Sequence, residues 1–83
     1  MTKEVILLIS KNCPHCPIAK IVWESFKREL DLKLKIIDAL SEEGKLLTSI
    51  YNIRSVPAAI VDRKHVIIGI PNRDEVLFLI KKS

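Results

Sequence analysis

The sequence has no long apolar stretch. Its N-terminal part offers only five successive apolar residues, Val5 to Ile9, before Ser10 and Lys11. A signal-peptide core needs about 7–15 apolar residues and a membrane span about 20, so five are too few for either. We therefore expect a protein without a membrane partner, and the cytoplasm is its default location.

Aromatic residues are also few: Trp23, Phe26, Tyr51 and Phe78. The net charge is +4, but the lysines and arginines are scattered among acids and do not alternate with aromatic side chains. Single-strand nucleic-acid binding usually needs aromatic rings for base stacking inside a basic groove. We expect no nucleic-acid partner, although scattered cations can still attract acidic proteins.

Internal repeats, low-complexity segments and linkers are absent. The 83 residues, of which 48% are hydrophobic, suffice for one small core. The sequence therefore predicts a single domain over residues 1–83 that needs no metal to fold, and we expect a monomer.

Cysteine occurs only twice, in the segment Cys13-Pro14-His15-Cys16. If a helix starts here, the spacing places both sulfurs on one side of its first turn, close enough for a disulfide. Unpartnered N–H groups and the positive end of the helix dipole favour a thiolate, the species that attacks disulfides. In a reducing compartment such a pair is more often catalytic or metal-binding than structural. A structural disulfide or two inert thiols are the simpler alternative.

Four strands are expected from the apolar runs. The run Val5–Ile9 is typical of a strand buried on both faces. Further strands are expected at residues 34–37, 58–61 and 66–70. The polar turn at residues 62–64 predicts that the last two form a hairpin.

Three helices are expected between and after these strands. In the first, apolar side chains recur at intervals of four: Ile18, Val22, Phe26 and Leu30. Ser41 can cap the second helix, and Asn72 with Glu75 can form a capping box for the third, after Pro71 stops the last strand. The order β-α-β-α-β-β-α predicts an α/β fold whose mixed four-stranded sheet has helices on both faces.

Three segments together resemble the thioredoxin/glutaredoxin superfamily. They are Cys13-Pro14-His15-Cys16-Pro17, Ile53-Arg54-Ser55-Val56-Pro57, and Gly69 near the end of the last strand. The resemblance extends over essentially the whole chain and is strongest to the small glutaredoxin-like thioredoxins of archaea. It implies a thioredoxin fold and a thiol–disulfide oxidoreductase that reduces or exchanges protein disulfides. It also implies that the cysteine pair is the redox group, with no further cofactor.

The resemblance implies a role for each of four residues. Cys13 corresponds to the exposed nucleophile and Cys16 to the more buried resolving thiol. Pro57 corresponds to a cis-proline that packs against the disulfide, and Val56 to the residue that pairs with the substrate backbone. The family's usual electron donor, a thioredoxin reductase, is the expected partner.

The residues around the cysteines are expected to tune them. Pro14 suits the first position of a helix. If Cys13 caps that helix, Pro17 cannot donate the first hydrogen bond to the Cys13 carbonyl, so either the turn is loosened or the helix begins later. A protonated His15 imidazole would stabilise the Cys13 thiolate and make the disulfide more oxidising; alternatively, His15 is an exposed bystander.

The sequence departs from the family at two places. Thioredoxins typically carry a tryptophan before the first cysteine and a buried aspartate in the preceding strand, where this chain has Asn12 and the apolar run. Glutaredoxins hold glutathione with a Gly-Gly and an aspartate near the last strand, where this chain has Gly69-Ile70-Pro71. Protein disulfides are therefore the expected substrates, and a glutathione-dependent glutaredoxin is an alternative.

Two further alternatives belong to other classes of function. The thiols of Cys13 and Cys16, with His15 and His65 as candidate further ligands, could form a metal-binding module, since thiolates suit zinc or Cu(I). A closed zinc site needs four ligands, however, and His65 falls in the expected hairpin with no second ligand near it in sequence. We expect no metal. A non-catalytic adaptor is the third possibility.

Overall fold

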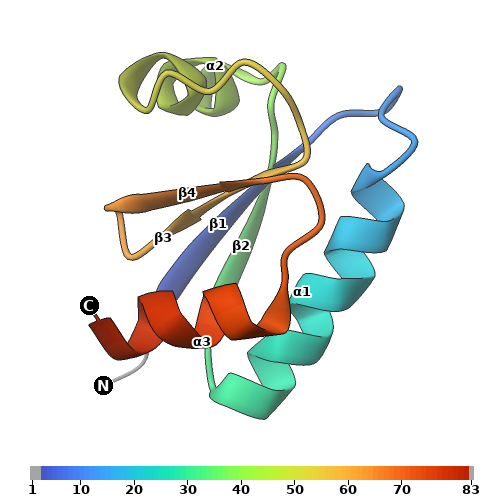
Figure 1. Cartoon of the computed structure of the whole chain (residues 1–83). Coiled ribbons are helices and arrows are strands. Elements are labelled where there is room, and N and C mark those ends of the chain that lie inside the picture. The colour runs from blue at the N-terminus through green and yellow to red at the C-terminus, as the bar shows by residue number, and fades with distance from the viewer. Residues whose placement is uncertain (1–2, 83) are drawn as a thin grey trace.

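The apolar runs and amphipathic segments of the chain form four strands and three helices in the order expected from the sequence (Figure 1). The computed structural model describes residues 3–82. Its elements are β1 (Glu4–Ile9), α1 (Cys16–Leu30), β2 (Lys33–Asp38), α2 (Glu42–Ile50), β3 (Ala58–Val61), β4 (His65–Ile68) and α3 (Arg73–Lys82). The predicted α/β class is confirmed. Within these described residues, no helix is long and apolar enough to cross a membrane.

The four strands form one mixed sheet in the order β2-β1-β3-β4. β1 is parallel to β2, with Leu7 opposite Ile36, and antiparallel to β3, with Leu7 opposite Ala59. β3 and β4 form the predicted antiparallel hairpin. The strand β1 lies between β2 and β3, so its C-terminal end is central in the sheet, and the chain leads from there to the segment Cys13–Cys16.

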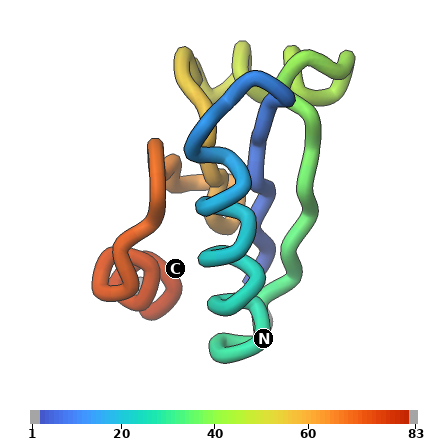
Figure 2. The backbone as a smooth tube through the Cα atoms, turned by 90° about the vertical axis from the view of Figure 1, so that its right-hand side faces the viewer, coloured from blue at the N-terminus to red at the C-terminus, as the bar shows by residue number. Residues whose placement is uncertain are grey.

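Helices cover both faces of the sheet, as predicted. Figures 1 and 2 show α1 and α3 together on one face and α2 on the other. Successive residues of a strand point to opposite faces, so Leu7 packs with the α1 and α3 side chains while Leu8 packs with the α2 side. Continuous apolar runs follow from this arrangement, because each inner strand needs apolar residues on both sides.

The buried face of α1 differs from the expected one. Its buried residues are Cys16, Ala19, Trp23 and Phe26, and the Trp23 and Phe26 rings meet edge-on with centroids 5.7 Å apart. These positions are three and four residues apart, so they share one face. Ile18 is 47% exposed, so the predicted stripe through Ile18 was wrong at that residue.

The α2 helix lies close to the end of β2. Ser41 caps the helix as predicted, because its Oγ accepts a hydrogen bond from the Gly44 amide at 3.0 Å. A Cβ atom on Gly44 would lie 2.1 Å from the Asp38 carbonyl oxygen. Only a glycine therefore lets the first turn of α2 approach this loop so closely.

The last two elements show small corrections. β4 ends at Ile68, two residues earlier than expected, because Gly69 has a φ of +83° and turns the chain. The Asn72 side chain accepts a hydrogen bond from the Asp74 amide at 2.8 Å and so caps α3 without the expected contact to Glu75.

Candidate active site

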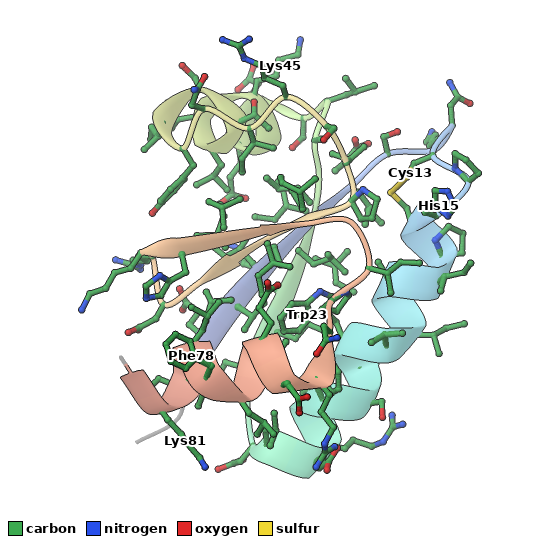
Figure 3. The ribbon with its side chains drawn as sticks, viewed as in Figure 1. Cys13, His15, Trp23, Lys45, Phe78 and Lys81 are labelled. Carbon is green, nitrogen blue, oxygen red and sulfur yellow. A yellow bond between two sulfur atoms is a disulfide. The ribbon has the colours of Figure 1, made fainter. Side chains whose placement is uncertain are left out.

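The two cysteines lie where β1 passes into α1. Cys13 belongs to a turn, in which its amide donates to the Ser10 carbonyl at 3.4 Å. Cys16 is the first residue of α1. Their Cα atoms are 5.4 Å apart and the two sulfur atoms form a disulfide (Figure 3). The chain thus brings its whole cysteine content into one redox pair.

The helix begins later than Cys13. Of the two expected alternatives, the later start is the one observed: the Cys16 amide donates to the Cys13 carbonyl at 3.4 Å, so that carbonyl is not left free by a loosened turn. Pro14 lies in the turn and not at the first helical position. Pro17 is the second residue of α1, where the amide has no partner within the helix and a missing N–H therefore costs little.

The two sulfurs differ in their access to solvent. Cys16 is only 2% exposed, whereas Cys13 is partly exposed. Pro14, His15 and Pro17 are exposed around them, and Figure 3 shows His15 beside Cys13 at the start of α1. A substrate disulfide can therefore reach the Cys13 sulfur more easily than that of Cys16.

The N-terminus of α1 carries an uncompensated positive dipole end. His15 occupies the N-cap position without a side-chain hydrogen bond, and the first turn contains no acid. The partial positive charge of about half a unit is therefore available to an anion at this position. A thiolate on Cys13 is placed to use it.

A loop far away in sequence completes the site. The Cys13 Sγ lies 3.5 Å from the Val56 carbonyl oxygen, a distance at which the reduced thiol can donate a hydrogen bond. The Val56–Pro57 peptide bond is cis, as expected from the resemblance. Pro57 is buried, and its carbonyl accepts a hydrogen bond from the Gly69 amide at 2.7 Å. Gly69, which follows β4, thereby holds the loop that contains Val56 and Pro57 in place.

The backbone of Val56 has unused hydrogen-bonding capacity. Among residues 3–82, its N–H has no hydrogen-bond partner and its carbonyl contacts only the Cys13 sulfur. Pro57 differs, because it has no N–H and its carbonyl is already bonded. Backbone groups in half-buried positions need partners, so Val56 presents a donor and an acceptor to an incoming chain.

A cavity next to Val56 could not be foreseen from the sequence. It has a volume of about 320 Å³ and lies between the ends of β1 and β2, the α2 helix and the loop before Pro57. Its lining includes Ser10, Lys45, Arg54 and Val56. No sequence spacing reveals this cavity, because its lining residues come from segments that are far apart in the chain.

The geometry gives no support to the metal alternative. In the part of the chain that the structure describes, no three His, Cys, Asp or Glu side chains gather as a metal site would require. His65 lies in β4 opposite Val61, in the hairpin. No polar or charged side chain of the described residues is buried, so no buried acid lies near Cys16.

Comparison with known proteins places these features in a family. The model of the thioredoxin domain family matches residues 1–81. A protein of Archaeoglobus fulgidus described as a probable thioredoxin is 32% identical over 76 residues, 92% of this chain and 84% of the relative. The thioredoxin of Methanocaldococcus jannaschii is 30% identical over 81 residues, 95% of this chain and 93% of the relative.

Solved structures of thioredoxins have the same fold. A mutant thioredoxin from Halobacterium salinarum superposes with a TM-score of 0.76 at 23% identity, over 96% of this chain and 73% of that one. Thioredoxin f from spinach chloroplasts gives a TM-score of 0.75 at 22% identity, over 98% and 75%. The four-stranded sheet with helices on both faces therefore matches the fold of these proteins over 73% and 75% of their chains.

Proposed function

The chain belongs to the thioredoxin family and is a thiol–disulfide oxidoreductase, and on this premise we propose that it reduces protein disulfides through Cys13 and Cys16. The observation that best supports a protein substrate is the free backbone of Val56 beside the Cys13 sulfur. One residue with both backbone groups available can pair with a substrate in the manner of a β-strand.

In the first step the Cys13 thiolate attacks one sulfur of a substrate disulfide. A new S–S bond forms between Cys13 and the substrate, the old S–S bond breaks, and the other substrate sulfur leaves as a thiolate that takes up a proton. The uncompensated N-terminus of α1 stabilises the attacking thiolate. Partial exposure of Cys13 lets the substrate approach it.

In the second step the Cys16 thiolate attacks the Cys13 sulfur. The Cys13–Cys16 disulfide forms, the mixed disulfide between Cys13 and the substrate breaks, and the second substrate sulfur leaves as a thiolate that takes up a proton. Two electrons have then passed from the protein to the substrate. Because the two Cα atoms are 5.4 Å apart, the ring can close within the range usual for disulfides. Since no described acid is buried near Cys16, water is the proposed proton acceptor for its thiol.

Val56 and Pro57 form the proposed substrate-binding residues. The substrate backbone bonds to the Val56 N–H and C=O, while buried Pro57 holds that residue against Cys13. Ile70 follows Gly69, whose amide is bonded to the Pro57 carbonyl, and Ile70 is 45% exposed. Its apolar surface lies at the flank of the site, where a protein substrate can cover it.

Pro14, His15 and Pro17 are the proposed tuning residues. The two prolines restrict the backbone on either side of His15 and fix the turn that presents Cys13. His15 lies exposed beside Cys13, where a protonated imidazole favours the thiolate. No other redox group or metal is proposed.

The proposed setting is the cytoplasm, where a reductant keeps the pair in its dithiol form. A thioredoxin reductase is the proposed electron donor, and the chain is proposed to act as a monomer with a single domain. A glutathione-dependent reaction is less well supported, because Gly69-Ile70-Pro71 stands where glutaredoxins carry their glutathione-binding glycines and aspartate.

Insulin reduction driven by dithiothreitol tests this proposal. The wild-type protein should accelerate the precipitation of reduced insulin chains, and Cys13→Ala should abolish the acceleration. Lys20→Ala, an exposed change on α1, is the matched control and should retain it. Full activity in Cys13→Ala would contradict the proposal.

A further inference from the structure

The cavity beside Val56 combines two unpaired positive charges. Its lining contains Lys45, from α2, and Arg54, from the loop before Pro57, and it contains no acid. Within residues 3–82 neither cation has an acidic partner, unlike Lys35, which lies 3.2 Å from Glu43. Figure 3 shows the Lys45 side chain extending from α2 into solvent. Both charges are therefore available to an external anion.

Neither of the two acids closest in sequence to Lys45, Glu42 and Glu43, lines the cavity. Glu43 bonds to Lys35, as described, and one carboxylate oxygen of Asp38 accepts a hydrogen bond from the Leu40 amide at 2.9 Å. Asp38 lines a separate hollow of about 250 Å³ with Ser10 and Lys11. The larger cavity therefore keeps a net positive lining. Ser10, Thr48 and Ser55 also line it and add small polar groups that can accompany a bound carboxylate.

From this lining we propose that the cavity is a specificity subsite for an acidic side chain of the substrate protein. The inference rests on the proposed pairing of the substrate with Val56. Arg54 precedes Val56 by two residues, and no described hydrogen bond uses the backbone of Arg54 or Ser55. A substrate chain paired at Val56 can thus continue along this loop to the cavity.

The direction of that pairing fixes which substrate residue enters the subsite. In an antiparallel pair of strands, one residue forms both of its backbone hydrogen bonds, N–H and C=O, with the single residue opposite. Antiparallel pairing is also slightly more stable per residue than parallel pairing. We consider a substrate that runs antiparallel to residues 54–56 with its cysteine opposite Val56. The substrate residues that lie beside Arg54 are then those on the C-terminal side of this cysteine. At about 3.3 Å per extended residue, the second residue after the cysteine reaches the level of Arg54.

The segment Gly69-Ile70-Pro71, which is joined to the other end of the loop at Pro57, carries no matching charge. A substrate residue N-terminal to the cysteine passes in the direction of the Gly69-Ile70-Pro71 segment, which contains no charged side chain. The subsite therefore distinguishes the two sides of the substrate cysteine. It favours a substrate with aspartate or glutamate after the cysteine over one with the same acid before it.

Matched peptide disulfides test the subsite. Four peptides form two matched pairs. In one pair the second residue after the cysteine is Asp or Asn, and in the other pair the second residue before the cysteine is Asp or Asn. The reduced protein is mixed with each symmetric disulfide, and peptide thiol is quantified by chromatography to give second-order rate constants at low salt. We expect the Asp-after peptide to react about three- to tenfold faster than its Asn partner, as two partly screened ion pairs allow. The Asp-before pair should show a ratio near one.

Charge variants assign the effect to the cavity. In the double variant Lys45→Gln, Arg54→Gln, the rate constant for the peptide with Asp after the cysteine should fall to about that for the peptide with Asn there. The rate constant for the Asn peptide shows whether the variant keeps its reactivity toward disulfides. Lys20→Gln, which removes an exposed lysine of α1 outside the cavity, should keep the wild-type ratio. A ratio unchanged in the double variant, or equal preferences for acid before and after the cysteine, would overturn the subsite.

Glutathione disulfide separates the two possible sources of the carboxylate. If the double variant slows reduction of glutathione disulfide while the peptides show no charge preference, the cavity binds a carboxylate of glutathione and the proposed subsite for a substrate protein is wrong. If the wild-type protein reduces no peptide at all, the proposed function fails. If it reduces all peptides at equal rates, only the subsite fails.

Discussion

The Cys13 sulfur lies 3.5 Å from the carbonyl oxygen of Val56, a residue 43 positions away in sequence. This contact joins the two segments that the proposed reaction needs. One segment supplies the nucleophile, and the other supplies free backbone groups to hold a substrate beside it. The Gly69 amide, bonded to the Pro57 carbonyl, fixes the second segment.

Methylation of a substrate amide should reveal the pairing with Val56. In a peptide disulfide whose backbone amides are methylated one at a time around the cysteine, the amide that donates to the Val56 carbonyl can no longer do so. A net hydrogen bond of about 0.5–1.5 kcal/mol predicts a rate loss of about two- to twelvefold at that position. Equal rates across the scan would show that the substrate does not pair with this loop.

Replacement of His15 should lower the reduction potential of the pair. A protonated imidazole stabilises the thiolate of the reduced form, so His15→Ala should make the disulfide less oxidising. We expect a fall of up to about 30 mV, which corresponds to about 1.4 kcal/mol for a two-electron couple. Equilibration with glutathione redox buffers measures it, with Lys20→Ala as a control for a more distant charge. An unchanged potential would identify His15 as a bystander.

Gly44→Ala should destabilise the fold although the residue lies in a helix. At an unconstrained helix position this change stabilises by about 1 kcal/mol. Here the added Cβ meets the Asp38 carbonyl at 2.1 Å, so α2 must shift, and we expect a loss of about 1–3 kcal/mol in unfolding free energy. Urea denaturation followed by circular dichroism measures it. The exposed change Ser49→Ala in the same helix should alter stability by about 0.5 kcal/mol or less; equal stability of both variants would contradict the close packing.

Sequence patterns predicted the elements well because the pattern and the burial agree along most of the chain. The run at Val5–Ile9 lies in a strand with apolar cores on both sides, so its composition leaves little choice of structure. Ser41 caps α2 because its hydroxyl reaches the Gly44 amide within one turn. Such local signals need no knowledge of the rest of the fold.

The predictions were wrong, or could not be made, where tertiary packing determines which residues are buried and where a helix begins. Hydrophobicity ranks Ile18 above Ala19, but the sheet lies close enough to α1 that the small residue is buried and Ile18 is 47% exposed. The start of α1 could not be fixed from the sequence, because Pro17 allowed either a loosened first turn after Cys13 or a helix that begins later, and the helix begins at Cys16. The cavity with Lys45 and Arg54 joins three separate segments and leaves no local pattern.

The central claim is that Cys13 attacks the substrate and Cys16 resolves the intermediate. Intact-mass spectrometry of Cys16→Ser and Cys13→Ser, each mixed with the same peptide disulfide, tests it most directly. Cys16→Ser should accumulate an adduct of one peptide on Cys13, because no second thiol remains to release it. Cys13→Ser should form little adduct, because Cys16 is only 2% exposed. An adduct that forms as fast on Cys16 in Cys13→Ser as on Cys13 in Cys16→Ser would contradict the assignment.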